Sequence, residues 1–226
     1  MLTDVNVAFI LTSGMLTTGT SFPYEMWLAA IEFSKVKRRG DSCSLSLVGF
    51  ETNGRSKPIS LTPDKLFEHD SIYDVIYLPA LWRNPTKVIE SVSSTLSPFL
   101  INNFSSGAQI AAVGSGVSLL ASSGLLDFKA ATTHWHYFER FRKQFPNVDL
   151  RSEFFITQAE TLYCAASINS LADVTVHLIE SFFDIETAMH VERNFSHEIR
   201  RSYDSQRFSF GGDGSSNDEL VIDAIS

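Results

Sequence analysis

The sequence predicts a three-layer α/β/α sandwich with a mostly parallel sheet, and three observations support this fold class. Short apolar runs of strand length recur along the chain and alternate with longer segments of helical character, as they do in α/β proteins. Some runs, such as residues 5–11, show no polar alternation, which is typical of strands buried on both faces of a parallel sheet. The chain has 226 residues, of which 44% are hydrophobic, and this supplies enough apolar side chains for one large core.

The expected elements follow one another in this alternating order. Residues 43–50 alternate polar and apolar side chains, as a half-buried strand does. The first helix is expected to have Pro23 near its start, where the missing N–H costs little. Basic side chains at its end favour the last turn, and Gly40 ends it. We expect strands at 5–11, 43–50, 75–78, 109–113, 153–157 and 161–164, and helices at 22–39, 85–104, 117–123, 136–145, 171–183 and 185–195.

The composition of the chain changes near residue 202. The segment that follows is rich in Ser, Gly, Asp and Asn, which is typical of a linker, and residues 219–225 then predict the start of another helix. We therefore expect residues 1–200 to form one domain. Residues 201–226 are expected to hold a linker and the truncated start of a second domain.

Charge and composition narrow the class of protein. A formal charge of -8 and a pI near 5.2 argue against a surface that wraps nucleic acid. No apolar run reaches the roughly 18 residues of a membrane span, and the first apolar run lacks the basic segment that precedes it in a signal peptide. Cys43 and Cys164 have no metal-type spacing and are expected to be small buried residues in a reducing compartment. The sequence therefore predicts a cytoplasmic protein without membrane contact.

The most informative stretch is residues 109–127, where a strand turns sharply into a helix, as in a nucleophile elbow. Gly114 stands at the turn, where glycine tolerates the strained backbone but has no side chain that attacks a substrate. Ser115 follows it, but the serine-hydrolase signature requires glycine at the two positions that Val113 and Val117 occupy. A phosphate-binding loop is excluded because no Lys-Ser or Lys-Thr pair follows Gly116.

This stretch also carries a family resemblance. Residues 110–127, IAAVGSGVSLLASSGLLD, followed by Ala-Thr-Thr-His-Trp at 131–135, resemble the class I glutamine-amidotransferase-like (ThiJ/PfpI) superfamily. Within it, they are most similar to the amino-terminal domains of AraC-type transcriptional regulators, in which the strand ends in Val-Cys-Thr-Gly. The family cysteine falls on Gly114. The resemblance covers roughly residues 5–208 and implies a flavodoxin-like sheet, and residues 218–222 resemble the first helix of the AraC-type DNA-binding module.

Other positions depart from the pattern of the catalytic members. Those members carry an acidic residue just before or within the first helix. Glu25 is the candidate here, whereas the aspartate position of some hydratases falls near Gly19. Members with an oxyanion hole commonly have Pro-Gly-Gly after the third strand, where this chain has Pro, Ala and Leu at 79–81. The resemblance thus implies a vestigial pocket, whose candidate lining residues are Glu25, Ala80, Leu81, Gly114, Ser115, Gly116, His134 and Trp135.

The histidines and tryptophans leave alternatives open. His134 is the remainder of a Cys-His pair that contacts a ligand, or a structural hydrogen-bonding residue in a half-buried loop. His134 and His136 have no third ligand at suitable spacing, so we expect no metal and no other cofactor. Trp27, Trp82 and Trp135 are core candidates, although the last two lie on loops expected to flank the elbow, where they would wall a pocket.

The resemblance implies a non-catalytic, effector-sensing and dimerisation domain of an AraC-family regulator. The expected partners are an unknown small-molecule effector and a second copy of the chain, and DNA is expected to bind only through a carboxyl-terminal domain absent from these residues. The alternative is a hydrolase or hydratase of the same superfamily that uses Ser115 or a water held by Glu25 and His134. A third reading is an assembly subunit without a ligand.

Overall fold

A seven-stranded sheet forms the centre of the computed structural model, which describes residues 4–37, 42–50, 61–82 and 85–195. Its strands lie in the order β3-β2-β1-β4-β5-β9-β8, and all neighbours are parallel except the antiparallel pair of β8 and β9. Apart from the two-residue edge strand β3, the parallel strands β2-β1-β4-β5-β9 have the flavodoxin-like order that the resemblance implied. The strands are β1 (Asp4–Leu11), β2 (Ser42–Gly49), β3 (Lys65–Leu66), β4 (Val75–Leu78), β5 (Gln109–Val113), β8 (Ile156–Ala159) and β9 (Leu162–Ala165).

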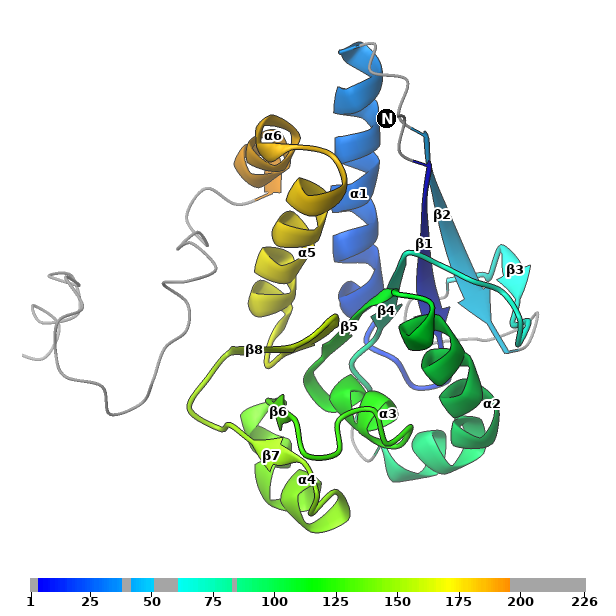
Figure 1. Cartoon of the computed structure of the whole chain (residues 1–226), viewed down its shortest axis with the longest axis vertical. Coiled ribbons are helices and arrows are strands. Elements are labelled where there is room, and N and C mark those ends of the chain that lie inside the picture. Colours follow the sequence, from blue (N-terminus) through cyan, green and yellow to red (C-terminus); the bar gives the residue numbers. More distant parts are fainter. Residues whose placement is uncertain (1–3, 38–41, 51–60, 83–84, 196–226) are drawn as a thin grey trace, which may run out of the picture.

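Helices cover both faces of this sheet (Figure 1), which confirms the three-layer α/β/α arrangement. One face carries α1 (Thr18–Val36), α5 (Ile168–Phe182) and α6 (Ile185–Phe195), which pack against one another. The other face carries α2 (Thr86–Ser105) and α3 (Val117–Ala121). A small lobe at the bottom of Figure 1 holds α4 (Phe138–Gln144) and a two-stranded sheet of β6 (Ala130–Ala131) and β7 (Asp149–Leu150).

Burial of the strands follows the hydrophobic pattern that predicted them. No residue of β4 is more than 2% exposed, because helices cover both faces of this central strand. The outer strand β2 alternates between exposed and half-buried residues along its first half. The continuous apolar runs are therefore central strands, and the alternating run lies nearer the edge.

The first helix begins earlier than expected. Thr20 and Ser21 donate backbone hydrogen bonds to the carbonyl of Thr17, at 2.9 and 2.8 Å, so α1 is already formed before Pro23. The placement of Pro23 near the helix start was therefore wrong by about one turn, since five helical residues precede it. The expected end at Gly40 lies outside the described residues, in which α1 ends at Val36.

The remaining elements differ little from the expectation. β4, β5 and α6 have the predicted bounds, and the two strands of the β8–β9 hairpin are shifted toward the carboxyl terminus. A single 3₁₀ turn, Trp135–Tyr137, precedes α4. The sequence did not predict β3, β6 or β7, because two residues are too few to show a hydrophobic period. The predicted linker and second domain at 201–226 lie outside the described residues.

The face beneath α1 and α5 contains a chain of buried hydrogen bonds, which we call the tyrosine network. Trp27 Nε1 donates to Tyr77 Oη at 2.9 Å, and Tyr77 Oη donates to Thr175 Oγ1 at 3.2 Å. Thr175 Oγ1 donates in turn to the carbonyl of Leu171 at 2.8 Å. The Tyr77 ring stacks on Phe9 with centroids 4.9 Å apart, and burial raises the pKa of Tyr77. Each polar group of this network therefore has a partner.

Two further expectations concern the cysteines and the membrane. Both cysteines are free thiols, Cys164 buried and Cys43 half-buried, and burial raises the pKa of each to about 12. Thiols of such high pKa are poor nucleophiles at neutral pH. Among the helices of the described residues, none is long and apolar enough to cross a membrane.

Candidate functional site

The predicted elbow is present at the carboxyl end of β5. Residues Gly114–Gly116 form one 3₁₀ turn that leads directly from the strand into α3. Gly114 has a φ of 54°. This lies in the left-handed region, which residues with a side chain rarely adopt and which glycine enters freely. The backbone is thus that of a nucleophile elbow, and the position that would project the nucleophile has no side chain.

The surroundings of Gly114 leave room for a first side-chain atom. A Cβ at this position would lie 3.4 Å from the Cβ of Ala80, 3.7 Å from the Cβ of His134 and 4.0 Å from the carbonyl oxygen of Ala166. Thr133 Oγ1 donates to the carbonyl of Gly114 at 2.7 Å and fixes the turn to the loop that carries His134. The structure therefore brings together Gly114, Ala80 and His134 of the predicted lining. Thr133 and Ala166 were not singled out from the sequence, although the Thr-Thr-His motif contained the signal for Thr133.

The hydroxyl of Ser115 is engaged with the loop after β4. It accepts a hydrogen bond from the N–H of Leu81 and donates one to the carbonyl of Leu81, both at 2.8 Å. Ser115 is 2% exposed. An activated serine needs a neighbouring base that takes its proton, whereas this proton is directed at a backbone carbonyl. Ser115 therefore fastens the loop to the elbow.

The loops after β1 and β4 are joined at the place where the strand order reverses, which is the usual ligand crevice of such sheets. Leu16 N–H donates to the carbonyl of Ala80, and Trp82 N–H donates to the carbonyl of Gly14, each at 2.7 Å. These bonds flank Leu81 in an antiparallel bridge, so its own N–H and carbonyl point away from the β1 loop. They point toward the elbow, where Ser115 pairs with both.

Gly116 is required for packing. A Cβ at this position would lie 2.1 Å from the carbonyl oxygen of Pro79 and 2.7 Å from its carbonyl carbon. The main chain after β4 thus passes directly over the start of α3, at a separation that only glycine allows. Gly116 belongs to the structure of the site, and its missing side chain leaves no space for a ligand.

The position on α1 that faces the elbow is Gly19. It is buried, and a Cβ there would lie 3.3 Å from Val113 Cγ1 and 3.4 Å from the backbone nitrogen of Ala80. Glu25 is exposed on α1 and is absent from the buried face of that helix. The sequence offered Glu25 as the acidic candidate of this segment, and placed the aspartate position of some hydratases near Gly19. Since α1 begins at Thr18, Gly19 occupies the first turn and Glu25 lies almost two turns further along.

His134 is half-buried beside Gly114 and has a structural contact of its own. Its Nδ1 accepts the backbone N–H of His136 at 3.3 Å and caps the 3₁₀ turn. Burial, and secondarily the charge of His136, lower the pKa of His134 below its ordinary value of 6.5. The ring is therefore neutral at pH 7, with its proton on Nε2 when Nδ1 accepts. The capping bond is the structural role that the sequence left open, and contact of His134 with a ligand stays a prediction.

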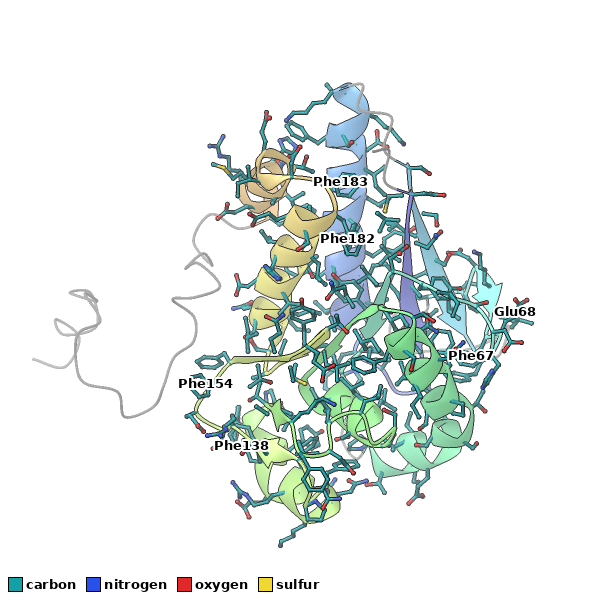
Figure 2. The ribbon with its side chains drawn as sticks, in the orientation of Figure 1. Phe67, Glu68, Phe138, Phe154, Phe182 and Phe183 are labelled. Atoms are coloured by element: carbon teal, nitrogen blue, oxygen red, sulfur yellow. The ribbon has the colours of Figure 1, made fainter. Side chains whose placement is uncertain are left out.

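The tryptophans differ from the expectation. Trp27 is fully buried in the tyrosine network, as a core residue whose ring lies against Phe182 and Phe183 (Figure 2). Trp82 is 54% exposed and Trp135 is 71% exposed, so neither is a core residue. Both lie on loops whose backbones are held by hydrogen bonds, while their rings extend toward solvent.

The atoms nearest a Cβ at Gly114 are the Cβ atoms of Ala80 and His134 and the carbonyl oxygen of Ala166. None of these three residues is charged at pH 7, because burial lowers the pKa of His134. Within the described residues, no cluster of three or more His, Cys, Asp and Glu side chains is arranged to hold a metal ion. The turn also contributes the first N–H groups of a helix start, which have no partner within the helix, and His134 carries its proton on Nε2 when Nδ1 accepts.

Comparison with known proteins adds the context of this fold. No protein-family model matches the chain. Over 135 residues, or 59% of the chain, the sequence is 27% identical to the HTH-type transcriptional regulator CdhR of Pseudomonas aeruginosa. The matched part spans 40% of the length of that regulator.

Solved structures resemble the chain over most of its length. A proposed transcriptional regulator from Vibrio parahaemolyticus has a TM-score of 0.76 at 18% identity, covering 85% of this chain and all of that one. An AraC family transcriptional regulator from Pseudomonas putida has a TM-score of 0.69 at 18% identity, with the same coverage. A ThiJ/PfpI family protein from Pseudomonas syringae has a TM-score of 0.70 at 18% identity, covering 87% of this chain and 76% of that one.

The chain has the ThiJ/PfpI fold. The resemblance predicted from residues 110–135, to ThiJ/PfpI proteins and to AraC-type regulators among them, is thereby confirmed. At 18% identity the structural likeness establishes the fold of this ThiJ/PfpI-like domain, and its chemistry has to be argued from its own residues.

Proposed function

We propose that this chain is the non-catalytic, effector-sensing and dimerisation domain of an AraC-family transcriptional regulator. The observation that carries the proposal is Gly114, a glycine with a φ of 54° at the elbow position on which the resemblance places the family cysteine. Gly19 repeats the pattern on α1, where an acidic side chain would face the elbow. Positions 114 and 19, at which the resemblance implies reactive side chains, are thus both glycine, although the fold is retained.

The alternative, a hydrolase or hydratase, finds little support in the geometry. Both hydrogen-bonding directions of the Ser115 hydroxyl are used by Leu81. A water held between Glu25 and His134 would need both side chains at the elbow, and Glu25 is exposed on α1, off the helix face that carries Gly19. His134 is a base without a nucleophile, and such a base catalyses no acyl transfer.

The effector site of this proposal is the space over Gly114. Its boundaries are Ala80, His134 and the backbone of Ala166, which leave room for a Cβ at 3.4–4.0 Å from each. A small polar or anionic group there would accept hydrogen bonds from His134 Nε2 and from the start of α3. The effector would favour one arrangement of the cytoplasmic dimer, and a DNA-binding domain beyond these residues would read that arrangement.

The proposal is tested by filling the space. Gly114→Ala adds a methyl group that meets Ala80 and His134, whereas Gly124→Ala adds one at a φ of 79° with no atom within 4 Å. Both substitutions cost backbone strain, and only the first occupies the site. Melting temperatures are measured with lactate, acetamide and ethanolamine as probes, beside sedimentation equilibrium for the dimer.

We expect a dimer that at least one of these probes stabilises, with the shift lost in Gly114→Ala and kept in Gly124→Ala. A monomer that no probe stabilises contradicts the sensing and dimerisation roles. A dimer whose melting temperature responds equally in both variants supports the third reading, an assembly subunit without a ligand at Gly114.

A further inference from the structure

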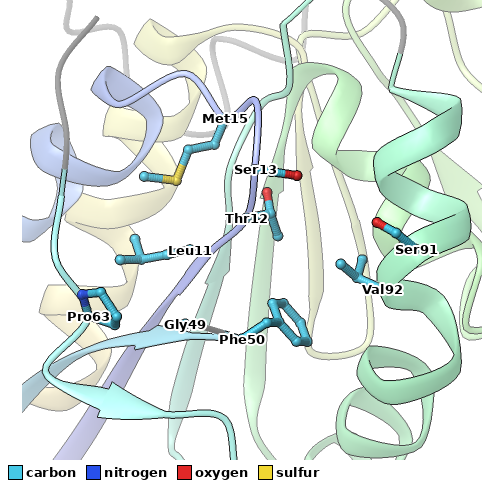
Figure 3. Close-up of a pocket in the computed structure, with 9 residues that line it drawn as sticks. All are labelled: Leu11, Thr12, Ser13, Met15, Gly49, Phe50, Pro63, Ser91 and Val92. Carbon is cyan, nitrogen blue, oxygen red and sulfur yellow. The ribbon is translucent and has the colours of Figure 1, made fainter. Parts of the chain in front are cut away.

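A cavity lies away from the elbow, at the carboxyl ends of β1 and β2 and beside the first turns of α2 (Figure 3). Its volume is about 210 Å³. Most of its wall is apolar and is contributed by Leu11, Met15, Phe50, Pro63 and Val92. None of these residues adjoins the position of the missing side chain at Gly114.

One polar group in this cavity is left without a partner. Thr12 is 6% exposed, and its hydroxyl has no hydrogen bond within the described residues. Figure 3 shows Thr12 in the middle of the lining side chains, between β1 and the helix that carries Val92. The hydroxyl of Ser91, by contrast, donates to the carbonyl of Val88 at 2.8 Å. A buried hydroxyl without a partner is unfavourable unless something in the cavity pairs with it.

The joined loops separate this cavity from the elbow. Met15 lines the cavity and is 1% exposed. It faces Leu81 in the antiparallel bridge between the loops after β1 and β4. Beyond Leu81 comes Ser115, which holds the loop to the elbow. A molecule in the cavity would therefore contact the β1 side of this connection, and a molecule over Gly114 the other side.

We propose that this cavity binds a compact, uncharged, largely apolar molecule whose single polar group pairs with the Thr12 hydroxyl. No charged side chain is present in the described lining, so a charged ligand would lose its hydration without compensation. An apolar cavity of about 150 Å³ holds benzene, and the larger volume here suits a benzene ring with one short polar substituent. The Thr12 hydroxyl either donates or accepts, so an alcohol or a ketone satisfies it. This binding is independent of a regulatory function of the chain.

The methionines provide a direct readout. The chain has 4 methionines, of which Met15 lines the cavity and Met26 is equally buried on the opposite face, in the core under α1. With methyl-labelled methionine, NMR spectra are recorded during titration with benzyl alcohol, toluene and benzoate. We expect benzyl alcohol to shift the Met15 methyl signal and leave Met26 unchanged. Toluene, which lacks the hydroxyl, should bind about fivefold more weakly, and benzoate should not bind.

Two variants complete the test. Thr12→Val keeps the shape of the side chain and removes the hydroxyl, so benzyl alcohol and toluene should bind it equally, and the free protein should be at least as stable as the wild type. Gly114→Ala should bind benzyl alcohol as the wild type does. The proposal is overturned if the Met15 signal is unchanged by benzyl alcohol, if Thr12→Val leaves the preference over toluene intact, or if benzoate binds best. A loss of stability in free Thr12→Val would also overturn it, because the hydroxyl would then have a partner.

Discussion

The elbow and the tyrosine network lie on the same sheet, and they differ in what their side chains do. In the tyrosine network every polar group has a side-chain or backbone partner within a fully packed core. At the elbow the positions expected to carry chemistry are glycines, while Ser115 and Thr133 still hold the backbone in place. The hydrogen bonds that fix the elbow therefore need no side chain at position 114, since Thr133 bonds to the backbone carbonyl of Gly114. A nucleophile can be lost from such a turn without loss of the turn.

The largest effect is expected for Gly116→Ala, which places a methyl group against the Pro79 carbonyl oxygen. The methyl group and the carbonyl are both attached directly to the main chain, so the clash is relieved only if the loop after β4 moves. We expect the free energy of unfolding, measured in urea, to fall by about 3 kcal/mol or more. Gly107→Ala is the control, because its Cβ meets no atom within 4 Å at a φ of 92°, and it should cost only about 1 kcal/mol of backbone strain. Equal effects of the two substitutions would refute the close approach at Gly116.

The next effect concerns the fastening of the loop to the elbow. Ser115→Ala leaves the N–H and the carbonyl of Leu81 without their hydroxyl partner in a buried position. The expected loss in unfolding free energy is about 2–3 kcal/mol. Ser123→Ala removes a half-buried hydroxyl that donates to the carbonyl of Leu120 and accepts a long hydrogen bond, 3.4 Å, from the N–H of Leu125, and should cost about 0.5–1 kcal/mol. A neutral Ser115→Ala would mean that the hydroxyl is free, as in a nucleophile.

A substitution in the tyrosine network should lower the unfolding free energy slightly less than Ser115→Ala does. Tyr77→Phe keeps the ring that stacks on Phe9 and leaves the indole N–H of Trp27 unpaired in the core. We expect a loss of about 1–2 kcal/mol in calorimetric unfolding. Tyr24→Phe makes the same chemical change in a half-buried ring that packs edge-on against Phe9, and should be nearly neutral. If both substitutions are neutral, the network contributes no stability beyond apolar packing.

The smallest effect is a pH dependence that arises from His134. Its pKa is lowered in the folded protein, mainly by burial, so the unfolded chain takes up a proton first as the pH falls below 6.5. Stability from this residue is complete above pH 6.5 and is lost as the pH falls toward the folded pKa. As the pH falls from 7.5 to about 5.5, the unfolding free energy of His134→Gln should therefore decrease less than that of the wild type. Urea titrations at each pH measure this difference. Parallel pH profiles for the two proteins would show that burial does not lower this pKa.

Much of the fold could be predicted because the signals were local. Continuous apolar runs bounded by turn residues located β4 and β5 to the residue. The start of α1 was missed because Thr, Gly and Ser are weak helix formers. Glu25 was the acidic candidate of this segment, and the structure places it on the exposed side of α1.

The candidate site was predicted in part, for the same reason. Gly114 and His134 were visible because they lie in a contiguous motif. The bonds between Ser115 and Leu81 were not, since they join residues 34 positions apart. The Thr12 hydroxyl is buried by residues from several separate segments of the chain. Its lack of a partner therefore has no local signal in the sequence.

The central claim, that the elbow has lost its catalytic function, is tested most directly by turnover. The wild type, Ser115→Ala and His134→Gln are assayed with p-nitrophenyl acetate, an amide substrate and methylglyoxal, each at several concentrations. The account predicts that all three proteins give the same rate as buffer containing an inert protein. Saturable turnover by the wild type that disappears in Ser115→Ala or His134→Gln would contradict it and establish an enzyme.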